Sequence, residues 1–167
     1  MKSFSLLLGF VMAGLISTAG AQVSPVRLRV EQSSKSDTTS YKNVQTRSLS
    51  IFLANSSAQP AEVKVKWAIF GRDIKSKEIV TVAQGETNAS IKASGSEKVQ
   101  TDAAHAVSEE ARTGSKGKSE AVGCRMVGHG VQVWQADRLV AEFYDPLSLK
   151  ESFGKAPPAQ LPEKKKK

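Results

Sequence analysis

The chain has 167 residues, of which 40% are apolar and 24% charged. This composition excludes wholesale disorder, and the length favours one domain with a substantial core over two domains. The formal net charge of +8 favours acidic partners, such as anionic glycans, lipid headgroups or nucleic acid, without selecting among them.

Residues 1–21 have the pattern of a cleaved signal peptide. Lys2 supplies a positive start, residues 4–16 form an apolar run, and small residues end at Ala21. The run is too short to span a bilayer, and no cysteine follows it as in a lipoprotein signal. We therefore expect export to the periplasm, the cell surface or the extracellular space, with no transmembrane segment in the mature chain.

The first strands are expected on both sides of a polar loop. Val26 to Val30 alternates apolar and basic residues and predicts an edge strand, whereas residues 33–41 are rich in Ser, Thr and Lys and predict a loop. Val44 to Asn55 predicts the next strand. A polar turn ending at Pro60 then leads into the following segment.

Residues 61–71 predict the central strand of the domain. Val63, Val65, Trp67 and Ile69 alternate with other residues, among them two lysines. A period of two places the apolar set on one face of a strand and the lysines on the other. Trp67 would then be an inward aromatic residue of a sandwich.

The middle of the chain has weaker patterns of secondary structure. Residues 77–83 predict a strand closed by a turn at Gly85, and residues 87–93 and 98–101 predict two shorter strands. Asp102 is in a position to cap a short helix within residues 102–112. Residues 114–119 predict a flexible basic loop.

The last third of the chain regains strong β character. Strands are expected at residues 121–127, 131–134 and 139–144, the last two joined as a hairpin by residues 135–138. The pattern Gly128-His129-Gly130 indicates a bulge or bend.

The domain is expected to close with a helical turn. Asp145-Pro146 is a typical start for such a turn, and Leu147, Leu149 and Phe153 would cover the end of the core. Residues 155–167, rich in Pro and Lys, predict a disordered tail.

These elements predict an all-β fold, an immunoglobulin-like antiparallel β-sandwich of about seven to nine strands with one or two short helical turns, over residues 22–154. Helices do not alternate with the strands, which disfavours a parallel α/β sheet. Cys124 is the single cysteine, so the fold has no internal disulfide, and the cysteine itself is interpreted as a small buried apolar residue.

The sequence does not favour an enzyme or a metal protein. Cys124, His129 and His105 lack the paired spacing of zinc ligands, and no G-x-S-x-G nucleophile motif is present. On one regular strand, Cys124 and His129 would lie on opposite faces, which disfavours a Cys–His catalytic pair. We expect no catalytic residue, no metal and no cofactor.

Basic residues provide the candidate binding surface. Lys64 and Lys66 share the outward face of the central strand, and Lys75 and Lys77 follow in the next turn and strand. These four lysines are the candidate anionic-ligand face, with the alternative that they only solvate an exposed sheet. Aromatic residues make up 6% of the chain, and together with export this argues against nucleic acid.

The strand run SLSIFLANSS, AEVKVKWAIFGRD and GVQVWQADRLVAEFYDP follows the signal peptide. With these features the chain resembles a group of secreted immunoglobulin-like proteins of mucin-associated gut bacteria. That group is linked to type IV pilus-like systems, and its sandwich is similar to archaeal type IV pilin head domains. The resemblance covers roughly Val26 to Tyr144 and carries over no site residue.

The chain departs from a pilin subunit at its start. A pilin keeps its apolar helix and is cut ahead of it, commonly after a Gly, with a Glu five residues in. Here Gly9 is followed by Phe10-Val11-Met12-Ala13-Gly14. The resemblance thus implies an exported module that accompanies such an assembly.

The resulting hypothesis is a non-enzymatic exported domain that acts by protein–protein contact in a cell-surface, pilus-like or adhesion context. Its contact surfaces would be the lysine face or an edge strand that pairs with a partner. The alternative is a periplasmic or surface module that binds anionic glycan through the lysine face.

Overall fold

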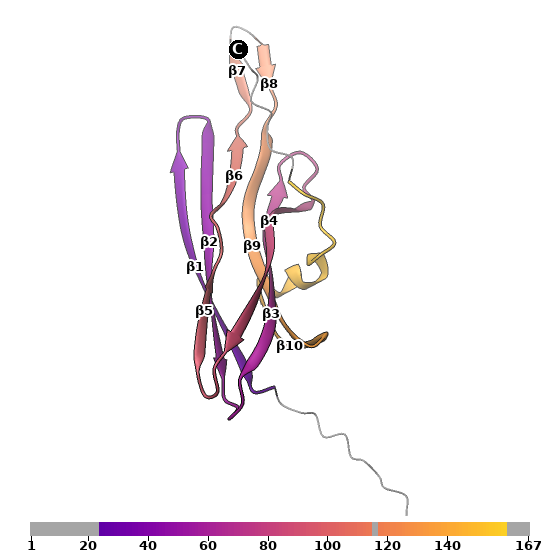
Figure 1. Ribbon diagram of the computed structural model, residues 1–167. Coiled ribbons are helices and arrows are strands. Elements are labelled where there is room, and N and C mark those ends of the chain that lie inside the picture. The colour runs from indigo at the N-terminus through magenta and orange to yellow at the C-terminus, as the bar shows by residue number, and fades with distance from the viewer. Residues whose placement is uncertain (1–23, 115–116, 160–167) are drawn as a thin grey trace, which may run out of the picture.

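The computed structural model describes residues 24–114 and 117–159. These residues form ten strands and one short 3-10 helix, η1 (Figure 1). The strands are β1 (Val26–Thr38), β2 (Lys42–Asn55), β3 (Ala61–Asp73), β4 (Ile79–Ile91), β5 (Ser96–Gln100), β6 (Ala104–Glu109), β7 (Arg112–Gly114), β8 (Gly117–Ser119), β9 (Val122–Gln135) and β10 (Arg138–Asp145), and η1 is Leu147–Ser152.

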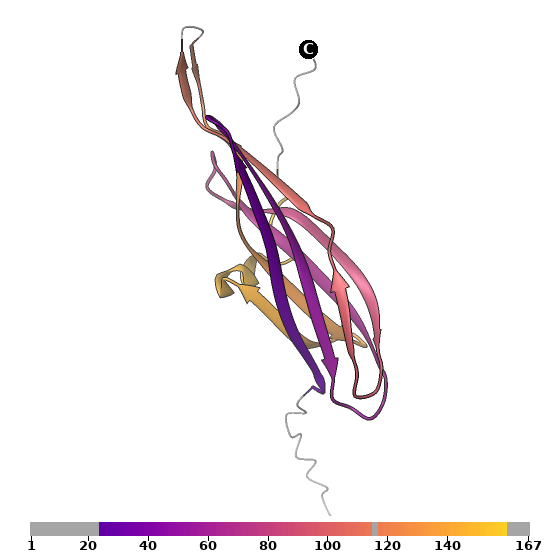
Figure 2. The same cartoon turned by 90° about the vertical axis from the view of Figure 1, so that its left-hand side faces the viewer.

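The strands form two antiparallel layers (Figure 2). In one layer β2 pairs with β1 on one side and with β5 and β6 on the other. In the second layer β9 and β3 are central, with β10 and β4 outside them. The start of β9 also pairs with β6, through Ser108 opposite Gly123, so the two layers are hydrogen-bonded together at one end.

The strand order is that of an immunoglobulin-like sandwich. The layer β1-β2-β5/β6 corresponds to strands A, B and E, and the layer β4-β3-β9-β10 to strands C′, C, F and G. The predicted all-β sandwich is confirmed. β3 occupies the central position expected for it, between β4 and β9.

The main core lies between the layers. Its largest fully buried aliphatic side chains come from β2, β3, β4 and β9. They are Leu49, Ile51, Leu53, Val65, Ile69, Ile91, Val131 and Val133. The predicted inward set of β3 is confirmed, because Val63, Val65, Trp67 and Ile69 all pack in this cluster. Cys124 is 2% exposed and packs there too, as expected.

A bulge in β9 reverses which of its alternating side chains point toward the core. Phe70 pairs with Gly128 and Gly71 with Met126, so Val127 is an extra residue of β9. The bulge is thus confirmed next to Gly128. A Cβ on Gly130 would lie 2.7 Å from Tyr144 Cδ1, which shows that β10 passes very close to this part of β9.

Two expected loops are strands instead. Residues 33–38 continue β1, because each pairs with a residue of β2 despite its polar side chain. Residues 79–91 are one strand, β4, because Gly85 does not turn the chain but pairs opposite Trp67. Cross-strand pairing outweighs the local loop and turn preferences in both places.

The helix expected within residues 102–112 is wrong. Residues 104–109 form β6, and Ala104 and Ala106 are buried against the main core. The burial of both alanines in the core shows that tertiary packing overrides their helix preference. Residues 112–114 and 117–119 form the hairpin strands β7 and β8 where a flexible loop was expected.

The C-terminal segment covers the outer face of the second layer (Figure 1). A second apolar cluster there contains Phe70 and Leu149, with Phe153 packed against it. Asp145 ends β10 and does not cap η1. Leu149 and Phe153 pack in this cluster as expected, whereas Leu147 is 73% exposed and does not cover the core.

Backbone hydrogen bonds continue beyond residue 154. The N–H of Thr81 donates to the carbonyl of Pro157, and the N–H of Ala159 donates to the carbonyl of Thr81. The start of the predicted tail is therefore attached to β4. The predicted signal peptide, residues 1–21, and residues 160–167 lie outside the described residues. No helix in the described part is both long and apolar enough to cross a membrane.

Candidate contact surfaces

Two of the four predicted lysines lie side by side on the outer face of β3. Lys64 and Lys66 are about half exposed, and both reach Glu86 of β4, at 3.1 Å and 3.6 Å. The hydrogen bond from Lys64, followed by the charges of both lysines, lowers the pKa of Glu86. The carboxylate therefore stays ionised and offsets part of the positive charge of this face.

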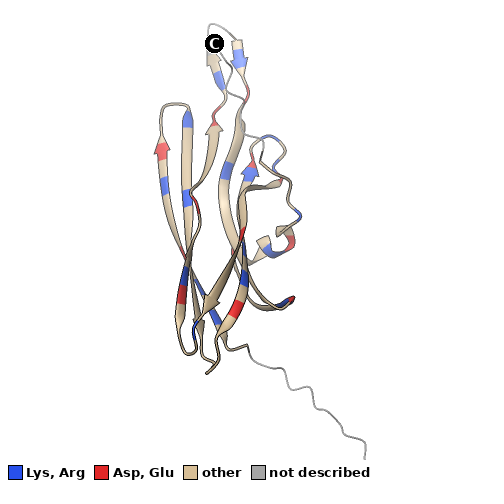
Figure 3. Cartoon of the chain, in the orientation of Figure 1, with Lys and Arg blue, Asp and Glu red and all other residues tan. Residues whose placement is uncertain are grey.

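The other two lysines lie elsewhere. Lys75 and Lys77 are in the turn between β3, which ends at Asp73, and β4, which begins at Ile79. Figure 3 shows basic and acidic residues interspersed along the strands. Lys75 pairs with Glu120 at 3.2 Å, and both side chains are largely exposed. The structure thus divides the predicted lysine face into two separate sites.

The lysine pair borders an ordered polar network on the same face. Trp134 of β9 lies opposite Lys64 and within cation–π range of Lys66, 5.8 Å from its ammonium. The indole N–H of Trp134 donates to Gln132 Oε1, and Gln132 Nε2 donates to the hydroxyl of Tyr144. These bonds hold the indole in one orientation.

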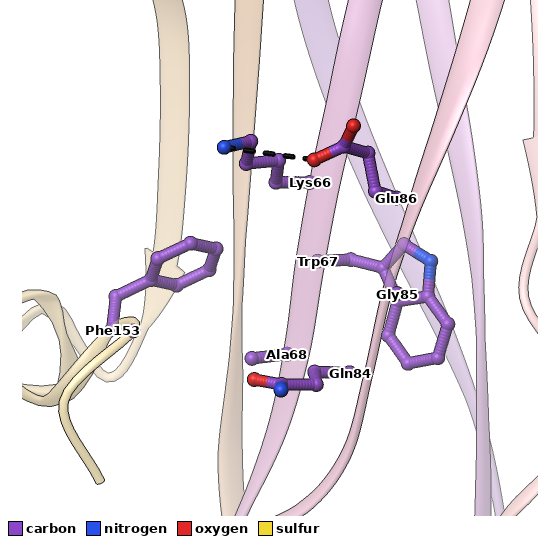
Figure 4. Close-up of a pocket in the computed structure, with 8 residues that line it drawn as sticks. Lys66, Trp67, Ala68, Gln84, Gly85, Glu86 and Phe153 are labelled. Carbon is purple, nitrogen blue, oxygen red and sulfur yellow. Dashed lines mark ion pairs between the residues drawn. The ribbon is translucent and has the colours of Figure 1, made fainter.

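Two shallow hollows flank this face. One, of about 360 Å³, lies between β3, β4 and Phe153, with Lys66, Gln84 and Glu86 at its border (Figure 4). Trp67 points to the opposite side of the strand from Lys66. The other hollow, of about 320 Å³, is lined by Lys64, Trp134 and Asp137 among others. Opposite charges border both hollows, so neither is a purely cationic site.

Cys124 and His129 lie on the same face of β9, contrary to the expectation. The extra residue at Val127 changes the alternation, so both side chains point into the interior. Burial raises the pKa of the Cys124 thiol, and burial followed by the charge of Arg47 lowers the pKa of His129. His105 is exposed, with Nδ1 3.1 Å from the hydroxyl of Thr46. The described residues contain no cluster of three possible metal ligands.

β1 is a long edge strand. It pairs with β2 over 13 residues without a register shift, and every side chain from Glu31 to Thr38 is exposed. Edge strands are protected by short length, charges, bulges or prolines, and β1 contains neither a bulge nor a proline over these residues. Figure 1 shows that this half of the β1–β2 hairpin stands apart from β10.

The direction of the backbone groups of β1 follows from the ends of the hairpin. The N–H of Thr39 donates to Lys42, and the N–H of Ser56 donates to Pro25. In an antiparallel ladder, hydrogen-bonded and non-hydrogen-bonded residue pairs alternate. Because Pro25 and Thr39 are both odd-numbered and both hydrogen-bonded, the odd-numbered residues of β1 bond to β2. The even-numbered residues, including Ser34 and Ser36, direct their N–H and C=O groups toward the open edge.

No model of a known protein family matches the sequence, and comparison with curated proteins gives no match. Several solved structures are similar at low identity. A candidate β-galactosidase of Bacteroides fragilis is 14% identical with a TM-score of 0.43, and a β-glucuronidase of glycoside hydrolase family 2 is 11% identical with a TM-score of 0.40. The alignments cover 69% and 68% of this chain but only 15% and 10% of those chains.

A protein from Akkermansia muciniphila is also similar. It is 11% identical with a TM-score of 0.33, and the alignment covers 82% of this chain and 95% of that one. All three alignments have TM-scores below 0.5.

Proposed function

We propose that this chain is a non-enzymatic, exported immunoglobulin-like domain that acts by protein–protein contact in a cell-surface, pilus-like or adhesion context. The edge of β1 carries the proposal. Its outer half combines eight consecutive exposed residues with backbone groups directed toward the open edge. A row of alternating N–H and C=O groups is complementary to another β-strand, so the partner of such an edge is a polypeptide.

The environment of Cys124 and His129, the two residues considered as a catalytic pair, supports a non-enzymatic role. The Cys124 thiol is buried and its pKa is raised, whereas a nucleophilic cysteine needs a lowered pKa and access to substrate. His129 is 2% exposed and its pKa is lowered. It is therefore closed off from an external proton donor or acceptor.

The alternative, an anionic-glycan module, would use the face of Lys64 and Lys66. The direct contacts of both lysines with Glu86 make this the weaker proposal. An anionic ligand would have to compete with a carboxylate that is already in place.

Cross-linking in the native cells with mass-spectrometric identification of neighbours tests the proposal. Ser34→Pro removes an N–H that points to the open edge and leaves the ladder to β2 intact, because Ser34 is an even-numbered residue of β1. Ser34→Ala keeps the N–H and is the matched control. We expect wild type and Ser34→Ala to recover the same surface or appendage protein, and Ser34→Pro to lose it.

Two results would overturn the proposal. One is recovery of the same protein neighbours by Ser34→Pro at wild-type yield. The other is recovery of no protein neighbour, with envelope polysaccharide eluting as salt rises, since screening weakens lysine–anion contacts. The second result would favour the glycan-binding alternative.

A further inference from the structure

Arg47 projects into the interior of the sandwich. It lies on β2 at the same alternation as Leu49, Ile51 and Leu53, which are fully buried. It pairs opposite Ser34 of β1 on one side and opposite the buried Ala104 of β6 on the other. A guanidinium therefore stands at the end of the apolar core, between the two layers.

The guanidinium is not neutralised by a direct contact. Its Nε is buried and has no hydrogen-bond partner in the described part of the chain. The ion pairs found among those residues do not include Arg47. Desolvation lowers the pKa of Arg47, and Asp145, too distant for a direct pair, raises it only in part. A half-buried cation without a hydrogen-bonded anion is costly.

A second unpartnered group lies close by. His129 of β9 is 2% exposed, its Nδ1 has no hydrogen-bond partner among the described residues, and Arg47 is near enough to lower its pKa. Buried polar atoms nearly always have partners, so the unpartnered Nε of Arg47 indicates that a further group belongs beside it.

A small hollow gives access to Arg47. It measures about 150 Å³, enough for one small polar group. Its border contains no carboxylate and is formed by Ser34, Lys35, Ser36, Gln45, Thr46, Arg47 and Met126. Gln45 Oε1 accepts from the N–H of Met126, which leaves the amide NH₂ of Gln45 available as a donor.

We propose that this hollow binds a carboxylate, with Arg47 as its main ligand. The guanidinium offers donors in the planar geometry that a carboxylate accepts, and the available amide donor of Gln45 lies on the same border. The carboxylate comes either from a free small acid or from an acidic side chain of a protein partner. Ser34 links the hollow to the open edge of β1, so the second source rests on the proposed function.

The protein purified from expression of the full chain is titrated with sodium formate at constant ionic strength, set with sodium chloride. The readout is the Nε–H resonance of Arg47 in ¹⁵N NMR spectra, assigned with Arg47→Met. We expect a saturable shift of this resonance and a rise in melting temperature of roughly 3 °C at ten times the dissociation constant. Arg47→Met should lose the rise in melting temperature.

Arg125→Met is the matched control, because Arg125 is an exposed arginine paired with Glu110 and should keep the full response. An Arg47 resonance that does not move, or a thermal response of Arg47→Met equal to wild type, overturns the proposal. Both readouts use the isolated protein, so they stand whether or not the edge of β1 binds a partner.

Repeating the cross-linking in the native cells distinguishes the two sources. If Arg47→Met loses the protein neighbour and formate competes with it, the acid belongs to the partner. If the neighbour is unchanged while formate shifts the Arg47 resonance, the ligand is a free small acid.

Discussion

The indole of Trp67 lies across Gly85, the residue directly opposite it on β4. A Cβ at position 85 would lie 2.6 Å from Cζ2 and 2.7 Å from Cε2 of that ring. A glycine in the middle of a strand therefore makes room for the largest side chain of the central strand.

Gly85→Ala should destabilise the domain by about 2 kcal/mol, because the new methyl group forces the indole out of its packed position. Chemical denaturation measures the change. In a Trp67→Leu background the smaller side chain leaves room for the methyl, so the same substitution should cost much less. Equal costs in the two backgrounds would show that the close contact does not limit substitution at Gly85.

Charge balance on the outer face of β3 depends on Glu86. Glu86→Gln removes the carboxylate shared by Lys64 and Lys66 and should strengthen retention on a heparin column, since both lysines become available to sulfates. Stability should change little, because the pairs are exposed.

Glu97→Gln on β5 is the control for this prediction. It changes the net charge equally but lies in the other layer. If both variants elute together, retention reports net charge and not the lysine pair.

The sequence predicts the parts of this fold that depend on the local alternation of apolar and polar residues along a strand. The facing of Val63, Val65 and Trp67 and the shared face of Lys64 and Lys66 both follow from a period of two. Ala104 and Ala106 are interpreted incorrectly because alanine favours a helix locally, whereas in the fold these alanines are buried in the core.

The chemistry around the candidate sites depends on register, which the sequence does not reveal. Glu86 meets Lys66 only because Gly85 lies within a strand and not in a turn. The glycines at 128 and 130 indicate a bulge but not which residue is extra; that residue, Val127, brings His129 to the inner face. Such long-range pairings decide which side chains meet.

Stability should fall with acidification because of His129. Burial, then the charge of Arg47 from β2, lowers its pKa below the ordinary value of 6.5, and Asp145 at the end of β10 opposes this only in part. Below pH 6.5 the unfolded chain binds a proton that the folded chain does not. Stability is therefore lost as the pH falls toward the folded pKa, by up to about 1.4 kcal/mol per pH unit.

Urea denaturation at a series of pH values between 6.5 and 5 measures this loss. His129→Gln removes the titrating group and should flatten the profile. His105→Gln, at the exposed histidine, should leave the wild-type slope. A wild-type slope in His129→Gln would assign the pH dependence to other groups.

The open edge of β4 is closed near one end by the chain itself. Three hydrogen bonds join Thr81 to the carbonyls of Ala156 and Pro157 and to the N–H of Ala159, and Ala156 packs against the second apolar cluster. A chain that ends after Gly154 loses all of these contacts and leaves the nearly buried backbone groups of Thr81 unpaired. It should be less stable by roughly 3 kcal/mol.

A chain that ends after Ala159 keeps every one of these contacts and is the matched control. It should unfold at the wild-type denaturant concentration, and the shorter chain should unfold at a lower one. Truncation also uncovers a strand edge, so we expect the shorter chain to self-associate at high concentration, as measured by sedimentation. If both chains match wild type in stability, the pairing at Thr81 does not secure β4, and β4 would offer a second open edge beside that of β1.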